Sequence, residues 1–139
     1  MPQNCRFAFA VHVLAVLAEQ GEAACSSPWL ARTVNTNPVV IRRLLADLAR
    51  AGLIRTERGP RGGARLRVAP SKIFLSNVLQ ATEGTTLFGR HPRRPLASCL
   101  VGCRIETVLE TIHKQARQAV ERELDAISLA DVLARCKDR

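Results

Sequence analysis

The sequence lacks any hydrophobic run long enough to span a membrane. Its longest apolar stretch, residues 7–18, is interrupted by His12 and is shorter than the roughly 20 residues that a membrane-spanning helix needs. The chain also lacks a basic leader followed by a hydrophobic core and a small-residue cleavage site, which is the pattern of a secretory signal. We therefore expect a cytoplasmic protein with no membrane partner.

Catalytic patterns are missing as well. The chain has no paired-carboxylate motif and no glycine-rich phosphate loop between a strand and a helix. Its cysteines and His113 have no third group that would orient them for nucleophilic catalysis. We therefore predict that the protein is not an enzyme.

Lysine is scarce, since Lys72, Lys114 and Lys137 are the only lysines among 21 basic residues, and the formal net charge is +9. Arginine is the residue suited to bidentate contacts with phosphate and guanine. Residues 1–70 hold 10 basic and 4 acidic residues, whereas residues 71–139 hold 11 and 8. We expect a nucleic-acid-binding surface in the first half of the chain.

The most informative motif is Arg-Gly-Pro-Arg-Gly-Gly-Ala-Arg-Leu at residues 58–66. Pro60 fixes its own φ, and Gly62 and Gly63 can adopt positive φ without steric cost, so this segment predicts a chain reversal. Residues 53–57 and 64–68 on either side alternate apolar with polar, as two half-buried strands do. A basic hairpin directly after a helix is typical of a winged helix-turn-helix. The candidate DNA contacts of this wing are Arg58, Arg61 and Arg65.

Two capping signals precede the hairpin. Ser26-Ser27-Pro28 and Asn37-Pro38 each combine a capping side chain with a proline that fits the first helical turn. They predict helices from about residue 27 to 34 and from 38 to 51, joined by a turn at residues 35–37, which together form a helix-turn-helix.

The third helix divides into two faces. Its core stripe is predicted at the i, i+3, i+4, i+7 positions Ile41, Leu44, Leu45 and Leu48. Its opposite face is short in the middle and basic at both ends, as a helix in a major groove requires. The candidate DNA contacts here are Asn37, which also caps the helix, and Val39, Arg42, Arg43 and Arg50.

Four further helices are expected, the last being a short helix from Leu129 to Cys136 that Ser128 caps. Residues 6–20 are apolar on every side, so this helix must be covered all round, in part by a second subunit, and His12 in it is expected to be buried. Ser71 is expected to cap a helix that runs to about Thr82. A long helix at about 104–126 carries an apolar stripe and is interpreted as a dimerisation arm. Its candidate interface residues are Ile105, Leu109, Ile112, Ala116 and Val120.

The five cysteines are an odd number, which in a reducing compartment favours free thiols, a sensor thiol or a metal ligand over a disulfide framework. Cys99 and Cys103 lie in a basic segment, and Cys103 directly precedes Arg104 at the predicted start of the long helix. A helix N-terminus and nearby cations stabilise a thiolate. We interpret these two cysteines as a candidate redox pair, the alternative being that they are inert small apolar residues.

Taken together, these motifs resemble the Rrf2 family of bacterial winged-helix transcription regulators, which includes IscR, NsrR and CymR. The resemblance covers nearly the whole chain. It depends on the apolar helix beginning Arg6-Phe7-Ala8, the turn at residues 34–40, the Gly52 junction, the wing, Glu83-Gly84 and the tail at residues 128–131. It implies a homodimer joined through the long helix that binds a palindromic operator, with the third helix in the major groove and a wing arginine in the minor groove.

The sequence departs from the family in the cysteine-containing loop. Members that hold an iron-sulfur cluster usually supply three cysteines there, whereas this chain offers Cys99 and Cys103 alone. His91 or a residue of a second subunit would have to complete such a site. We therefore expect no cofactor, with an iron-sulfur cluster at His91, Cys99 and Cys103 as the alternative.

The sequence thus predicts a mainly α protein in three parts. These are a winged helix-turn-helix at residues 1–83, a basic cysteine-containing loop at 84–103, and a dimerisation helix with a short final helix at 104–139. The function expected is that of a homodimeric repressor that binds double-stranded DNA and responds to oxidation. The alternative is a winged-helix interaction module that binds an acidic protein, but arginines on both the third helix and the wing favour DNA.

Overall fold

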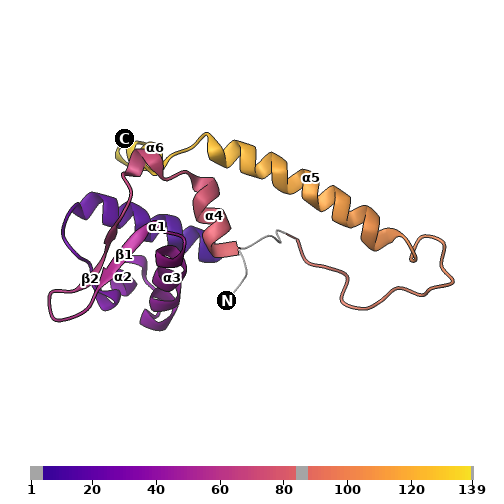
Figure 1. Cartoon of the computed structure of the whole chain (residues 1–139), viewed down its shortest axis with the longest axis horizontal. Helices are drawn as coiled ribbons and strands as arrows, with labels where there is room; N and C mark the ends of the chain where they lie inside the picture. The colour runs from indigo at the N-terminus through magenta and orange to yellow at the C-terminus, as the bar shows by residue number, and fades with distance from the viewer. Residues whose placement is uncertain (1–4, 84–87, 139) are drawn as a thin grey trace.

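The computed structural model describes residues 5–83 and 88–138. The elements follow the order α1 (Cys5–Gln20), α2 (Ser27–Val34), α3 (Pro38–Arg50), β1 (Ile54–Glu57), β2 (Gly63–Leu66), a short 3-10 turn η1 (Pro70–Lys72), α4 (Leu75–Glu83), α5 (Ile105–Asp125) and α6 (Leu129–Lys137). Helices α1–α4, the hairpin and α6 form one body, and α5 with the loop before it extends from that body as an arm (Figure 1). The mainly helical winged fold is as predicted.

Helix α1 lies at the centre of the body. It contacts α2, α3, α4, α6 and β2, and Ala10, Val13, Leu14 and Leu17 are buried. The sequence analysis expected a second subunit to cover part of this helix, but elements of the same chain cover most of its apolar surface. His12 is exposed, so the prediction that it is buried was wrong, because it lies on the one side of α1 that none of these elements covers.

The helix-turn-helix begins and ends where its capping residues predict. Ser26 Oγ accepts the Trp29 N–H at 3.3 Å, and Asn37 Oδ1 accepts the Val39 N–H at 2.8 Å. Asn35 adopts a left-handed conformation with φ of 64° and ends α2. The predicted core stripe of α3 is buried in full, at Ile41, Leu44, Leu45 and Leu48.

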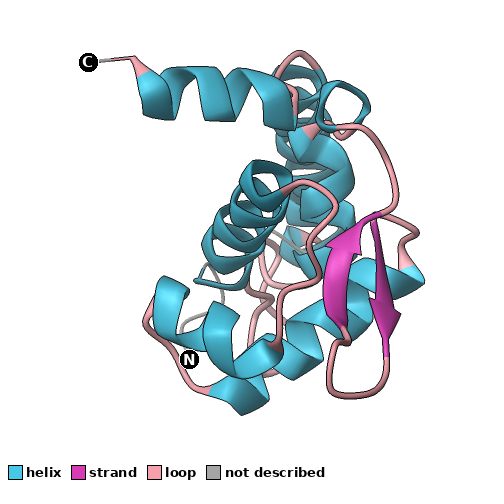
Figure 2. Ribbon diagram, turned by 90° about the vertical axis from the view of Figure 1, so that its left-hand side faces the viewer, coloured by secondary structure: helices cyan, strands magenta, loops and turns pink. Residues whose placement is uncertain are grey.

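The wing is an antiparallel hairpin at one edge of the helical body (Figure 2). Thr56 pairs with Ala64, and Ala64 exchanges two backbone hydrogen bonds with Cys25, at 2.8 and 2.9 Å. A Cβ on Gly62 would lie 2.2 Å from the Glu57 carbonyl oxygen, and a Cβ on Gly63 would lie 2.4 Å from that of Cys25. Glycine is therefore required at both positions for steric reasons, beyond the turn itself.

The segment after the wing differs from the sequence prediction. Ser71 lies inside the 3-10 turn η1, and α4 begins at Leu75, where Asn77 Oδ1 accepts the Phe74 N–H at 3.0 Å. The prediction of a Ser71 cap was wrong because residues 73–75 pair with residues 127–129 through Leu75 N–H to Ile127 O and Leu129 N–H to Ile73 O. This bridge attaches the beginning of α6 to the body.

Helix α5 has no buried residue. It contacts α4 near its C-terminal end, where the Ser76 hydroxyl donates to the Asp125 carboxylate. The rest of the helix extends away from the body together with residues 88–104 (Figure 1). A helix of this length with an apolar stripe, none of which is buried among the described residues, has the geometry of an interface.

Candidate nucleic-acid interface

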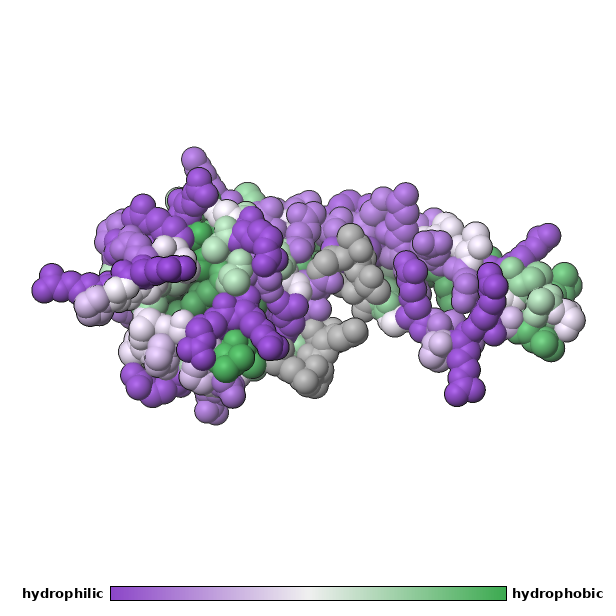
Figure 3. All heavy atoms as spheres, turned by 60° about the horizontal axis from the view of Figure 1, so that its bottom comes forward, coloured by the Kyte–Doolittle hydropathy of each residue, from purple (hydrophilic) through white to green (hydrophobic). Residues whose placement is uncertain are grey.

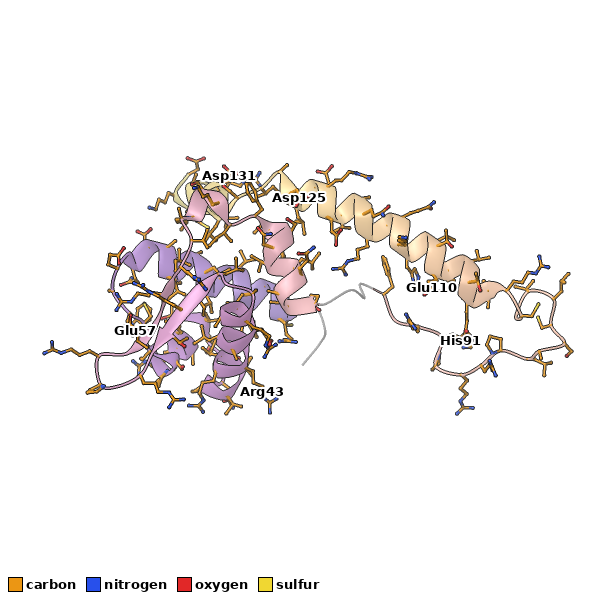
Figure 4. All side chains as sticks on the ribbon, in the orientation of Figure 1. Arg43, Glu57, His91, Glu110, Asp125 and Asp131 are labelled. Carbon is orange, nitrogen blue, oxygen red and sulfur yellow. The ribbon has the colours of Figure 1, made fainter. Side chains whose placement is uncertain are left out.

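The candidate DNA face of α3 is exposed along its length. Arg42, Arg43 and Arg50 are exposed, as is Val39, on the side opposite the buried stripe. Arg43 lies at the lower edge of the body in Figure 4, in the half of α3 nearer its N-terminus. A helix-turn-helix reads base edges with the N-terminal part of its second helix, so these side chains are available for that role.

The wing tip presents a second group of cations. Arg58 and Arg61 lie in the turn between β1 and β2, and both are exposed. In Figure 1 this turn and the N-terminal end of α3 lie at the same lower edge of the body. Two separate elements therefore bring arginines to one side of the molecule, where a duplex can contact both.

Arg65 differs from the other wing arginines. Its guanidinium donates to Glu57 Oε2 at 3.0 Å, and only 21% of its side chain is exposed. Its Nε is buried and has no hydrogen-bond partner among the described residues. Arg65 is therefore already engaged within the wing, although it remains one of the predicted DNA contacts.

Asp47 is a residue of this surface that the sequence interpretation did not single out. It accepts an ion pair from Arg6 of α1 and a second from Arg50 at 3.1 Å, and its side chain is only 19% exposed. Beside this cluster, Glu83 of α4 accepts the Phe7 N–H at 3.2 Å. These contacts hold α3, α1 and α4 together at one end of the body. One feature of the sequence could have pointed to Asp47, since it is the sole acidic residue between Glu22 and Glu57.

The two candidate redox cysteines lie in one exposed turn before α5. Cys99 Sγ accepts the Gly102 N–H at 3.2 Å, and Cys103 Sγ donates to the Leu100 carbonyl at 3.0 Å. The Cys103 N–H donates to the Cys99 carbonyl at 3.0 Å, so the backbone between them forms a helical turn. By contrast, Cys25 is buried in the body, and burial raises the pKa of its thiol.

His91 does not join the two cysteines in a ligand set. Its Nδ1 accepts the Arg93 N–H at 3.4 Å. Within residues 5–83 and 88–138, no group of three or more histidine, cysteine, aspartate or glutamate side chains is arranged to hold a metal ion. The donor set of a single chain therefore does not fit an iron-sulfur cluster, which needs about four ligands and usually thiolates.

The predicted dimer stripe is exposed to solvent in the single chain. Ile112 is 50% exposed, and Ile105, Leu109 and Ala116 are only half-buried on the same side of α5. The Ile105 N–H donates to the Val101 carbonyl at 2.9 Å, which places Val101 one turn before Ile105 on the same stripe. Figure 3 shows apolar side chains gathered at the far end of the arm, where Leu96, Leu100 and Val101 are largely exposed. We call the stripe from Ile105 to Val120 the α5 seam.

Comparison with known proteins gives a consistent result. Residues 4–135 match the family described as Rrf2, iron-dependent transcriptional regulator. The chain is 36% identical over 131 residues to YwnA of Bacillus subtilis, named as an HTH-type transcriptional regulator, and the match covers 94% of this chain and 96% of YwnA.

Solved structures resemble the chain over similar spans. CymR of Bacillus subtilis, titled the global cysteine regulator, is 25% identical, with a TM-score of 0.66 and 93% of each chain covered. IscR of T. potens is 24% identical, with a TM-score of 0.69, covering 95% of this chain and 85% of that one, and it supports the fold alone.

Among the described residues, no helix is both long enough and apolar enough to cross a membrane.

Proposed function

The chain belongs to the Rrf2 family of DNA-binding transcriptional regulators, and on that premise we propose that it acts in the cytoplasm as a homodimeric repressor at a palindromic operator. The family and the relatives reported above are regulators rather than enzymes. Family membership also favours the regulator over the alternative of a module that binds an acidic protein.

The observation that carries the proposal is the set of exposed arginines that α3 and the wing bring to one side of the body. In the proposed complex, α3 enters the major groove, where Arg42 and Arg43 contact base edges. Arg50 contacts the phosphate backbone, with Asp47 limiting its rotamers. Arg58 and Arg61 at the wing tip enter the adjacent minor groove. Arg65 stabilises the wing itself through its ion pair with Glu57.

The homodimer is supported by the α5 seam. None of its apolar side chains is buried among the described residues, and Ile112 and Val120 are 50% and 38% exposed. An apolar stripe of this length stabilises an assembly when a second copy covers it. A two-fold dimer presents its two α3 helices to half-sites about one turn of DNA apart, which is roughly 10 base pairs. Repression then follows where such an operator overlaps a promoter and the bound dimer blocks the polymerase.

We propose that Cys99 and Cys103 make operator binding responsive to oxidation. The Cys99 thiolate, to which Gly102 N–H donates, attacks a peroxide oxygen and becomes a sulfenic acid as hydroxide leaves. The Cys103 thiolate then attacks that sulfur, hydroxide leaves, and a disulfide forms, so that two thiols and one peroxide yield a disulfide and two waters.

The disulfide would change the structure of the arm. In a helical turn, Cβ atoms four residues apart lie about 5–6 Å from each other, whereas a disulfide needs about 3.5–4.5 Å. The turn at residues 99–103 must therefore rearrange, and it leads directly into α5. Because the seam begins there, oxidation would alter the angle between the two recognition helices. Thiol chemistry needs only these two cysteines, whereas a cluster needs ligands that the described residues of one chain do not bring together.

The proposal is tested by selecting duplexes from a random pool with the purified protein and measuring affinity by fluorescence anisotropy. The selected sequences should be palindromic and bound at least a thousandfold more tightly than scrambled duplex, as specific regulators are. Weak, sequence-independent binding would instead indicate that the basic surface meets some other acidic partner.

A further inference from the structure

A cavity lies between residues 88–91 and α5. None of the proposed DNA-contacting arginines and neither redox cysteine lines it, and of the proposed interface residues of the α5 seam only Leu109 borders it. The cavity volume is about 490 Å³, within the range of roughly 300–1,000 Å³ that small-molecule sites occupy. One wall is formed by Phe88, Gly89, Arg90 and His91, and the other by residues of α5 between Glu106 and Arg117. In Figure 4, His91 lies on the loop below α5, and Glu110 lies on α5 itself.

The cavity has an apolar and aromatic floor. The Phe88 and His113 rings lie with centroids 4.9 Å apart and planes tilted by 31°, and Leu109 lies beside them. Such a surface favours a flat or bulky apolar group over a small hydrated ion.

The charges of the cavity are separated along α5. Glu106 and Glu110 lie toward the N-terminal end, whereas Lys114 and Arg117 lie toward the C-terminal end. Glu110 and Lys114 are four residues apart, about 6 Å along the helix axis, and no ion pair joins them among the described residues. The Glu110 contact to Arg90 is long, at 4.0 Å, and both side chains are largely exposed. The carboxylate of Glu110 and the ammonium of Lys114 are therefore free to meet a ligand.

We infer that this cavity binds a small zwitterion with an aromatic or large apolar side chain, of the chemical class of an aromatic amino acid. The ligand's ammonium group meets Glu110 and Glu106, and its carboxylate meets Lys114. Its side chain stacks against Phe88 and His113. A zwitterion matches both signs of charge in the cavity. A simple anion would place its charge near the two glutamates, and a simple cation would place its charge near Lys114.

The position of the cavity connects a ligand to regulation, and this part of the inference rests on the proposed function. Residues 88–91 precede the turn with Cys99 and Cys103. They contact α5 through the Phe88–His113 ring pair and through the long Arg90–Glu110 pair. A ligand that contacts both walls would hold the loop against α5. It would thereby fix the arm beside the seam that joins the two subunits.

The experiment is isothermal titration calorimetry of the full-length protein, without DNA, using three probes. These are L-phenylalanine, 3-phenylpropionate, which lacks the ammonium group, and 2-phenylethylamine, which lacks the carboxylate. We expect L-phenylalanine to bind with one site per chain, and each analogue to bind at least tenfold more weakly. Absence of binding by L-phenylalanine at millimolar concentration would overturn the inference, as would equal binding of 3-phenylpropionate.

Matched variants locate the site. Lys114→Gln and Glu110→Gln should each weaken L-phenylalanine binding at least tenfold, whereas Arg122→Gln, an exposed change on α5 outside the cavity, should leave it unchanged. Equal affinity in all three variants would place the ligand elsewhere and contradict the inference. Circular dichroism and sedimentation establish that each variant keeps its fold and assembly. Because DNA is absent, failure of ligand binding is distinguishable from failure of the DNA-binding proposal.

Discussion

Replacing Ile112 of the α5 seam by glutamate should weaken the dimer, and the size of the effect follows from the exposed fraction of the Ile112 side chain. Ile112 is 50% exposed in the single chain, and full burial of an isoleucine side chain contributes about 1.5–3 kcal/mol. Covering the remaining half in a dimer therefore contributes about 1 kcal/mol per subunit, or about 2 kcal/mol for the two symmetric copies. In Ile112→Glu this contribution is lost, and two carboxylates must also be buried without partners, at a cost of several kcal/mol. The total loss exceeds about 4 kcal/mol, so the dimer dissociation constant should rise at least about a thousandfold.

The assay is sedimentation velocity over a range of protein concentrations, with circular dichroism to establish that the variant is folded. Gln118→Glu is the matched control, since Gln118 is exposed on the same helix away from the seam. It introduces the same charge and should remain dimeric. A folded Ile112→Glu protein that dimerises with unchanged affinity would refute the assignment of the interface to α5.

Four further predictions concern the other proposed sites. Arg43→Ala should weaken operator binding by about 1–3 kcal/mol and relax base preference at one position of each half-site, as measured by anisotropy against single-base operator variants. Arg58→Ala should lower affinity for all sequences alike and reduce the salt dependence of binding by about one phosphate contact per subunit. Mild peroxide should reduce operator affinity of the parent protein but not of Cys99→Ser or Cys103→Ser, and mass spectrometry should find the modification at these two cysteines. Ser128 and Asp131 form a capping box at the N-terminus of α6. Hydrogen bonds from the Ser128 backbone N–H and then from its side chain lower the pKa of Asp131, so the ionised carboxylate stabilises the fold above pH of about 4 and loses that effect as the pH falls further. The difference in melting temperature between the parent and Asp131→Asn should therefore narrow in acid.

Each of these predictions has a result that would contradict it. Arg122→Ala, on α5 and outside the DNA face, is the control for the arginine variants, and an equal loss of affinity there would mean that net charge alone explains their effect. If both serine variants respond to peroxide as the parent does, the loop is not a redox sensor. A constant difference in melting temperature across the acid range would remove the assigned role of the Asp131 carboxylate.

The parts of the fold that the sequence predicted are those with local signals. Asn37-Pro38 marked the beginning of α3 because a capping oxygen and a proline act within the same helical turn. Gly62 and Gly63 indicated the wing because glycine favours a turn through its own local backbone freedom. The extent of α5 also followed from periodicity, since its apolar stripe repeats along one helix.

The features that the sequence did not predict depend on contacts between distant residues. Ser71 carried a plausible cap, but the chain there is set by pairing with residues more than 50 positions later. The ion pair between Arg6 and Asp47 joins residues 41 positions apart, and no periodic pattern indicates such a pair. The cavity beside α5 depends in the same way on where residues 88–91 lie against the helix.

The central claim, that a two-fold dimer reads DNA with α3 and the wing, is tested most directly by hydroxyl-radical footprinting on a selected operator. A two-fold dimer should give two protected regions related by a dyad, with centres about 10 base pairs apart. Substitution of Arg43 by alanine should weaken both regions equally, because each subunit contributes one copy of that residue to its own half-site. A single protected region without two-fold symmetry, or a footprint that Arg43→Ala leaves unchanged, would contradict the account.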